Sequence, residues 1–105
     1  MKMTSLEIKE KAWEMLKNTT SLDDDAFNAT AIYFRIDSEY NLVVWCDICF
    51  EENDERYFLV SVRYNPDDEI FGDDIGAEWC SQDVSKESLF ETIDEVLSLY
   101  HKEVK

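Results

Sequence analysis

The 105 residues are 45% hydrophobic and 13% aromatic, with two glycines and one proline, and 25 acidic against 10 basic side chains give a formal net charge of −15. An aromatic-rich chain of this length has room for one hydrophobic core and is unlike a disordered acidic tail, so we expect one folded domain over residues 1–105. The charge repels nucleic acid and anionic lipid, which argues against direct binding to either of them.

The first helix is predicted at residues 3–18. Thr4 and Glu7 have the spacing of a capping box, and Met3 with Ile8 has that of the hydrophobic staple that accompanies it. The apolar face of this helix consists of Ile8, Ala12, Met15 and Leu16. A polar, acidic connection is expected to follow it.

Three segments with strand character come next, at residues 27–36, 42–50 and 56–64. In each one, apolar side chains alternate with others, and β-branched and aromatic residues are frequent, which is the pattern of half-buried strands. One face would carry Ile32, Phe34, Ile36, Leu42, Val44, Cys46, Ile48, Phe50, Phe58, Val60, Val62 and Tyr64. Short polar connectors at residues 37–41 and 51–54 suit hairpins, so the pattern predicts a three-stranded antiparallel meander.

The rest of the chain is predicted to be a loop and a helix. Pro66 ends the third strand, because proline has no N–H to donate. An acidic loop over residues 67–76 follows, with a short fourth strand at residues 77–80 as an option. Ser85 is a suitable N-cap for the last helix. The buried stripe of that helix would be Leu89, Ile93, Val96, Leu97 and Tyr100. The sequence therefore predicts an α+β fold of order α-β-β-β-(β)-α, with a three- or four-stranded antiparallel sheet and a helix at each terminus.

Nearly all of the excess charge lies in the middle of the chain. Residues 21–83 hold 17 acidic side chains and three arginines, which accounts for −14 of the −15. Most of these acids fall in predicted connections, whereas both helices have mixed charge. Because uncompensated like charge costs folding energy, we favour a surface complementary to a basic groove over a merely solubilising one.

The predicted partner-binding residues come from two acidic segments and the tryptophan that follows them. They are Glu51, Glu52, Asp54 and Glu55 in the second hairpin, and Asp67, Asp68, Glu69, Asp73, Asp74, Glu78 and Trp79 in and after the acidic loop. A tryptophan at this place either anchors a contact or plugs the end of the core.

The second face of the sheet is a rival interface. Val43, Trp45, Tyr57 and Leu59 would lie on it, opposite the main apolar stripe. If both helices cover the other face, this one is apolar enough for a contact site or a homodimer interface. One helix on each side, or a loop folded over the sheet, is the alternative.

Candidates for catalysis or metal binding are few. Cys46 and Cys49 have CxxC spacing, but residues three apart on a strand point to opposite faces, so buried structural cysteines are favoured over a redox or zinc site. His101, the one histidine, lies near a helix end without an evident partner. The acidic loop lacks the ligand spacing of an EF-hand, and no phosphate-binding glycine motif occurs. We therefore expect no catalytic residue, no metal and no cofactor.

The sequence also bears on the compartment. No apolar run approaches the ~20 residues of a membrane helix, and residues 1–10 lack the apolar stretch of a secretion signal. Three cysteines, an odd number, fit poorly with a secreted disulfide scaffold. These features indicate a cytoplasmic protein.

In charge, size and element order, the chain resembles the small acidic inhibitors that phages encode, including anti-CRISPR proteins and other DNA mimics. The ten acidic residues named above carry the resemblance. It implies a non-catalytic inhibitor, in the bacterial host cytoplasm, that occupies the basic groove of a nucleic-acid-processing protein such as a CRISPR or restriction nuclease. Two alternatives stay open: an immunity protein that neutralises a cationic toxin such as a nuclease, and an adaptor or structural subunit that binds through the apolar sheet face.

Overall fold

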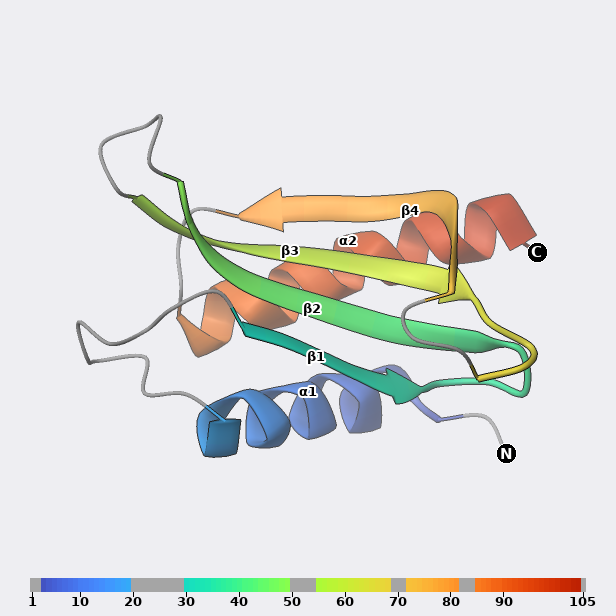
Figure 1. Cartoon of the computed structure of the whole chain (residues 1–105), viewed down its shortest axis with the longest axis horizontal. Coiled ribbons are helices and arrows are strands. Elements are labelled where there is room, and N and C mark those ends of the chain that lie inside the picture. Colours follow the sequence, from blue (N-terminus) through green and yellow to red (C-terminus); the bar gives the residue numbers. More distant parts are fainter. Residues whose placement is uncertain (1–2, 20–29, 50–54, 69–71, 82–84, 105) are drawn as a thin grey trace.

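A computed structural model describes residues 3–19, 30–49, 55–68, 72–81 and 85–104. The elements follow the predicted order, with the optional fourth strand present (Figure 1). They are α1 (Ser5–Thr19), β1 (Thr30–Arg35), β2 (Tyr40–Cys49), β3 (Glu55–Tyr64), β4 (Asp73–Ser81) and α2 (Lys86–Val104). The predicted α+β fold is thus confirmed. The early part of the predicted first strand, residues 27–29, lies outside the described residues.

The four strands form one antiparallel sheet in the order β1-β2-β3-β4. Val44 of β2 faces Ile32 of β1 on one side and Val60 of β3 on the other, so the predicted apolar stripes align across the sheet. Strands that follow one another in the chain are therefore neighbours in the sheet, as in the predicted meander.

The fourth strand is longer than predicted. β4 begins at Asp73, so Asp73 and Asp74 lie on a strand and pair with Tyr64 and Arg63, whereas the sequence placed them in a loop. The register then shifts between Val62 and Arg63, so that Val62 faces Ala77. Gly76, with a φ of 83°, supplies the left-handed backbone at this bulge. The bulge and the acidic residues interrupt the alternation of apolar and polar residues from which a strand is predicted, so the sequence analysis made this strand too short.

Both helix starts are capped as predicted. The backbone N–H of Glu7 donates to Thr4 Oγ1 at 3.2 Å, and the backbone N–H of Thr4 donates back to Glu7 Oε1 at 3.1 Å. The latter bond in particular holds the pKa of the Glu7 carboxyl below its ordinary value. At α2, the backbone N–H of Ser88 donates to Ser85 Oγ at 3.1 Å.

Both helices pack against the same face of the sheet, which we call the helix face. The buried side chains of α1, α2 and all four strands form one core there. It consists of Ile8, Ala12, Leu16, Ile32, Phe34, Ile36, Leu42, Val44, Phe58, Val60, Val62, Ala77, Leu89, Ile93, Val96, Leu97 and Tyr100. The predicted stripe of the last helix is therefore confirmed. Neither described helix is long and apolar enough to cross a membrane.

Candidate functional site

Acidic side chains from two separate connections meet at one end of the sheet. The turn between β1 and β2 and the connection between β3 and β4 both lie at this end (Figure 1). They are joined directly, because the backbone N–H of Asn65 donates to the carbonyl of Glu39 at 2.6 Å. We call this region the acidic end and define it by Asp37, Glu39, Asp67, Asp68, Asp73 and Asp74. All of these except Asp37, which is half-buried, are exposed.

Arg35 ties the two connections together. Its Nη1 donates to the carbonyl of Asn65 at 2.7 Å and to the carbonyl of Ser38 at 3.1 Å. Its Nη2 lies 3.4 Å from Asp68 Oδ1, and the Asp68 side chain stays 69% exposed. An ion pair this exposed contributes little to stability, whereas the two carbonyl bonds fix the connection in place. We call these contacts the Arg35 bridge.

The backbone of the β3–β4 connection is also constrained. Asp68 has a φ of 53° and Gly72 a φ of 72°. A side chain at residue 72 would place its Cβ 2.5 Å from the Tyr64 carbonyl oxygen, so the chain passes too close there for any residue except glycine. The described ends of this connection are therefore held at defined positions beside β3.

A tyrosine cluster supports the acidic end from the helix side. Tyr100 of α2 donates to Asp37 Oδ2 at 3.1 Å, and Tyr64 donates to Glu39 Oε2 at 3.4 Å. The Tyr40 ring lies between them, with centroid distances of 5.1 Å to Tyr100 and 5.4 Å to Tyr64. Burial, together with the bond to Asp37, raises the pKa of Tyr100 to about 12. Burial and the Glu39 carboxylate also raise the pKa of Tyr64. Both phenols are therefore neutral donors that orient the carboxylates.

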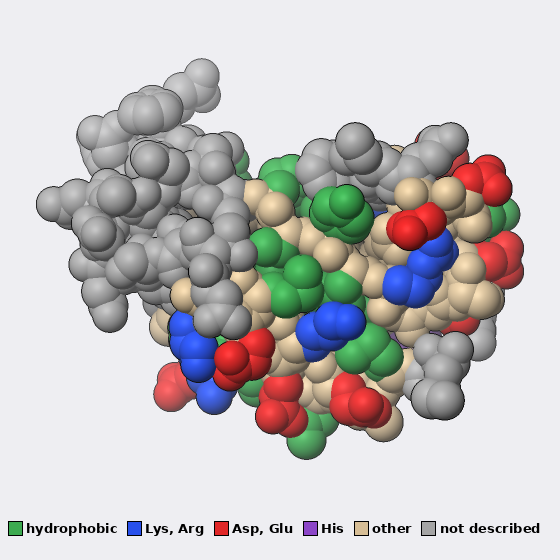
Figure 2. All heavy atoms as spheres, turned by 60° about the horizontal axis from the view of Figure 1, so that its bottom comes forward, with side chains coloured by type: hydrophobic (Ala, Val, Ile, Leu, Met, Phe, Trp, Pro, Cys, Tyr) green, Lys and Arg blue, Asp and Glu red, His purple; other side chains and the backbone are tan. Residues whose placement is uncertain are grey.

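The helix surfaces differ from the acidic end in their charge. Lys9 of α1 lies 3.1 Å from Asp94 of α2, and Lys17 lies 3.1 Å from Glu14. Figure 2 turns the α1 side forward and shows Lys and Arg side chains interspersed with Asp and Glu. The negative charge of the described residues is thus least compensated at the acidic end.

Of the first predicted acidic segment, the structure describes the backbone of Glu55 alone, which lies at the other end of β3 from the acidic end. Glu55 begins the ten-residue strand β3 and Asp67 follows its end, so the length of the strand, roughly 30 Å at the usual rise, separates them. Glu51, Glu52, Asp54 and Glu69 lie outside the described residues, as does the side chain of Glu55. Of the predicted site, the structure brings together Asp67, Asp68, Asp73 and Asp74, and it adds Asp37 and Glu39, which the sequence analysis missed.

Glu78 and Trp79 lie farther along β4, away from the acidic end. Trp79 is 51% exposed, so it does not plug the core, and its role as an anchor stays a prediction. Leu59, Glu78, Trp79 and Cys80 line a shallow, open hollow of about 340 Å³ over β3 and β4.

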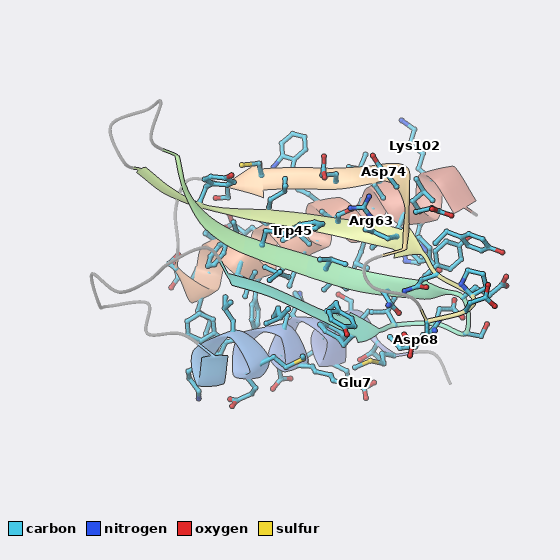
Figure 3. The ribbon with its side chains drawn as sticks, viewed as in Figure 1. Glu7, Trp45, Arg63, Asp68, Asp74 and Lys102 are labelled. Atoms are coloured by element: carbon cyan, nitrogen blue, oxygen red, sulfur yellow. The ribbon has the colours of Figure 1, made fainter. Side chains whose placement is uncertain are left out.

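The face of the sheet opposite the helices, here the outer face, combines aromatic and polar groups. Trp45, Tyr57 and Leu59 are half-buried on it, as the sequence predicts for a face without helices, and Val43 is fully buried. The Arg63 guanidinium lies over the Trp45 ring, 5.6 Å from its centroid (Figure 3). Arg35 also lies on this face, and its contacts with Asn65 and Asp68 hold these two residues at one end of the face.

Two polar residues of the outer face are as deeply buried as the core. Asn41 and Ser61 have no exposed surface, and neither the Asn41 amide nor the Ser61 hydroxyl has a hydrogen-bond partner among the described residues. The sequence analysis missed both of them, because polar residues at alternating strand positions usually face solvent.

Of the candidate reactive side chains, the structure describes those of Cys80 and His101. Cys46 and Cys49 lie on β2, as predicted, but their side chains are not described. Cys80 and His101 are both exposed. Over the described ranges, no group of three or more His, Cys, Asp or Glu side chains is placed to hold a metal ion.

Comparisons of the chain with protein-family models, with curated proteins and with solved structures find no match. The acidic end therefore has to be interpreted from its own geometry.

Proposed function

We propose that the protein is a non-catalytic inhibitor that binds the basic groove of a nucleic-acid-processing protein through its acidic end. The supporting observation is the Arg35 bridge, which holds the acids of two separate connections side by side. Carboxylates present oxygen acceptors to Arg and Lys much as phosphates do, and Arg can pair with them through two hydrogen bonds. A nuclease groove is the kind of surface that carries such cations in number.

Rigid presentation of the charge favours this function. A binding surface that is already ordered loses less conformational entropy on association. The acidic end is held by the Arg35 bridge on the outer face and by the tyrosine cluster on the helix side. Its concentrated charge would also speed the encounter with a basic partner and steer its orientation.

Inhibition assays with charge-reversed variants test the proposal. The panel consists of CRISPR effector, restriction and cationic toxin nucleases, each assayed for DNA cleavage, and a positive result with a toxin alone would identify an immunity protein. One variant replaces Asp67, Asp68, Asp73 and Asp74 with Lys. The matched control replaces the exposed helix residues Glu10, Glu87, Glu91 and Glu95 with Lys. Each set of four reversals, at two charges per residue, changes the net charge from −15 to −7.

Inhibition should be lost in the acidic-end variant and kept in the control. Since Asp68 pairs with Arg35 and Asp74 accepts a bond from the Gly76 backbone N–H, a second variant changes Asp67 and Asp73 alone. That variant should fold, and it should inhibit the nuclease more weakly than the parent does. Equal losses in the acidic-end and control variants would show that net charge alone matters. Full inhibition by the acidic-end variant would direct attention to the outer face, with Trp45 and Tyr57, as the surface of an adaptor.

A further inference from the structure

β4 is an edge strand of the described sheet. In the described sheet it pairs with β3 alone, so one row of its backbone N–H and C=O groups faces away from the sheet. Such an edge is a template for pairing with another strand, and proteins usually protect it.

The stretch after the bulge is suited to strand addition. From Ala77 to Ser81 the register with β3 is regular, Ala77 facing Val62 and Ser81 facing Phe58. Within it, the largest exposed apolar side chain is Trp79, next to the open hollow. An added strand would gain backbone hydrogen bonds from the edge, and its side chains would gain contact area from the indole.

The charges on β4 select the partner. Asp73, Asp74 and Glu78 are all exposed, and β4 carries no basic residue. Pairing with a second copy of β4 would bring like charges together across the new strand pair, which is destabilising. A strand that carries lysine or arginine would instead place cations beside Glu78.

We propose that residues 77–81 of β4 accept a basic, extended segment of a partner protein as a fifth strand. Cationic side chains of the segment would lie beside Glu78 on the outer face, and apolar ones would contact Trp79 on the other side. The proposal rests on the proposed function in taking the partner to be basic, but it uses a different surface from the acidic end.

The test uses a short peptide in which lysine or arginine alternates with valine. Binding is followed by amide hydrogen exchange and by NMR shifts of the full chain. A control peptide has the same side chains but carries N-methyl groups on alternate backbone nitrogens, which removes the donors that strand pairing needs and keeps the charge. A second control peptide has glutamate in place of the cations.

The expected result is slower exchange at alternate amides of residues 77–81, with about tenfold or greater loss of affinity for the N-methylated peptide. Trp79→Ala and Glu78→Lys should each weaken binding, and both sites are exposed, so the fold should persist. Equal affinity for the N-methylated peptide, protection at the β1 edge instead, or no binding of the cationic peptide would overturn the proposal.

The Asp67→Lys variant separates this proposal from the proposed function. Asp67 lies outside β4, so the variant should bind the cationic peptide like the parent. Suppose that reversal of the acidic end abolishes nuclease inhibition, but the cationic peptide does not slow amide exchange in residues 77–81. This result would refute strand addition alone. If instead the peptide adds as a strand, and reversal of the acidic end leaves inhibition unchanged, the proposed function alone would be refuted.

Discussion

The two faces of the sheet both bury side chains, but to different extents and with different chemistry. On the helix face, Val44 and Val60 are fully buried in an apolar core. On the outer face, Val43, Asn41 and Ser61 are also fully buried, although both helices lie on the opposite side. Apolar burial favours folding, whereas a buried polar group without a partner opposes it. The helix face therefore provides most of the stability, and the outer face keeps polar groups at some cost.

The free-energy cost of burying Asn41 and Ser61 needs a physical reason. Most buried polar groups in folded proteins have partners, and exceptions often accompany sites that serve another purpose. Asn41 is flanked in register by Arg35 on β1 and Arg63 on β3. This row lies at the end of the sheet where the Arg35 bridge holds the β3–β4 connection. The outer face thus contributes to the arrangement of the acidic end more than to the core.

The largest effect on the free energy of unfolding is expected for a substitution on the helix face. Replacing the fully buried Ile93 with Ala should lower the free energy of unfolding by about 2–5 kcal/mol, because the cavity adds to the lost burial. The half-buried Leu59 on the outer face is the matched control, and Leu59→Ala should cost clearly less. Denaturant unfolding measures both. A greater loss at Leu59 would reverse the assignment of the two faces.

Loss of the Arg35 bridge should have the second-largest effect on the free energy of unfolding. Arg35→Ala removes the charged donor from the carbonyls of Asn65 and Ser38, which should cost about 2 kcal/mol in unfolding free energy. Amide exchange in residues 65–68 should become faster, while exchange in α2 should change in proportion to global stability alone. If residues 65–68 keep their protection, the bridge does not hold the connection in place.

The tyrosine cluster gives a smaller effect that depends on pH. Tyr100→Phe removes the bond to Asp37 and should cost about 1 kcal/mol at neutral pH. The pKa of Tyr100 is raised to about 12 in the folded protein, above the value of about 10 in the unfolded chain. The unfolded chain therefore loses this proton first, and stability should fall as the pH rises from 10 to 12.

Denaturant unfolding from pH 9 upward, with phenolate absorbance as a second probe, checks this pH dependence. The parent should lose stability with a steeper slope than Tyr100→Phe. Tyr64, whose pKa is also raised, contributes in the same direction and leaves some slope in the variant. Identical slopes would mean that Tyr100 titrates as it does in the unfolded chain.

The smallest effect is expected at Ser61. Its hydroxyl is buried and has no hydrogen-bond partner in the part of the chain that the structure describes, so Ser61→Ala should change the unfolding free energy by less than about 0.5 kcal/mol. Val43 faces Ser61 across the strand pair and is buried to the same extent, and Val43→Ala should cost about 2 kcal/mol. A large loss on Ser61→Ala would reveal a hydrogen bond that stabilises this face.

Local patterns in the sequence were enough for most of the fold. The alternation in residues 42–50 and 56–64 and the stripe from Leu89 to Tyr100 depend on one face being apolar. The structure confirms the stripe, and it confirms the alternation where it describes the side chains, at residues 42–45 and 57–64. Thr4 with Glu7 and Ser85 were predicted because caps depend on residues a few positions apart. β4 was predicted too short, since the register shift near Gly76 interrupts the pattern.

The candidate site was less predictable, because it depends on contacts between distant segments. Arg35 lies 30 residues before Asn65, and no local spacing indicates their hydrogen bond. The one available signal was that Arg35 and Arg63 are two of just three basic residues in the acidic middle of the chain. Likewise, the distance between Glu55 and Asp67 follows from the strand that separates them, not from their shared charge.

The most direct test measures the association rate with an inhibited nuclease as a function of salt concentration. If the acidic end guides the encounter, the rate for the parent should fall steeply with salt. The variant with Lys at Asp67, Asp68, Asp73 and Asp74 should associate slowly and show little salt dependence. The helix control, with the same net charge, should keep most of the parent's rate and slope. Equal slopes for these two variants would contradict the account and assign the effect to the total charge of the chain.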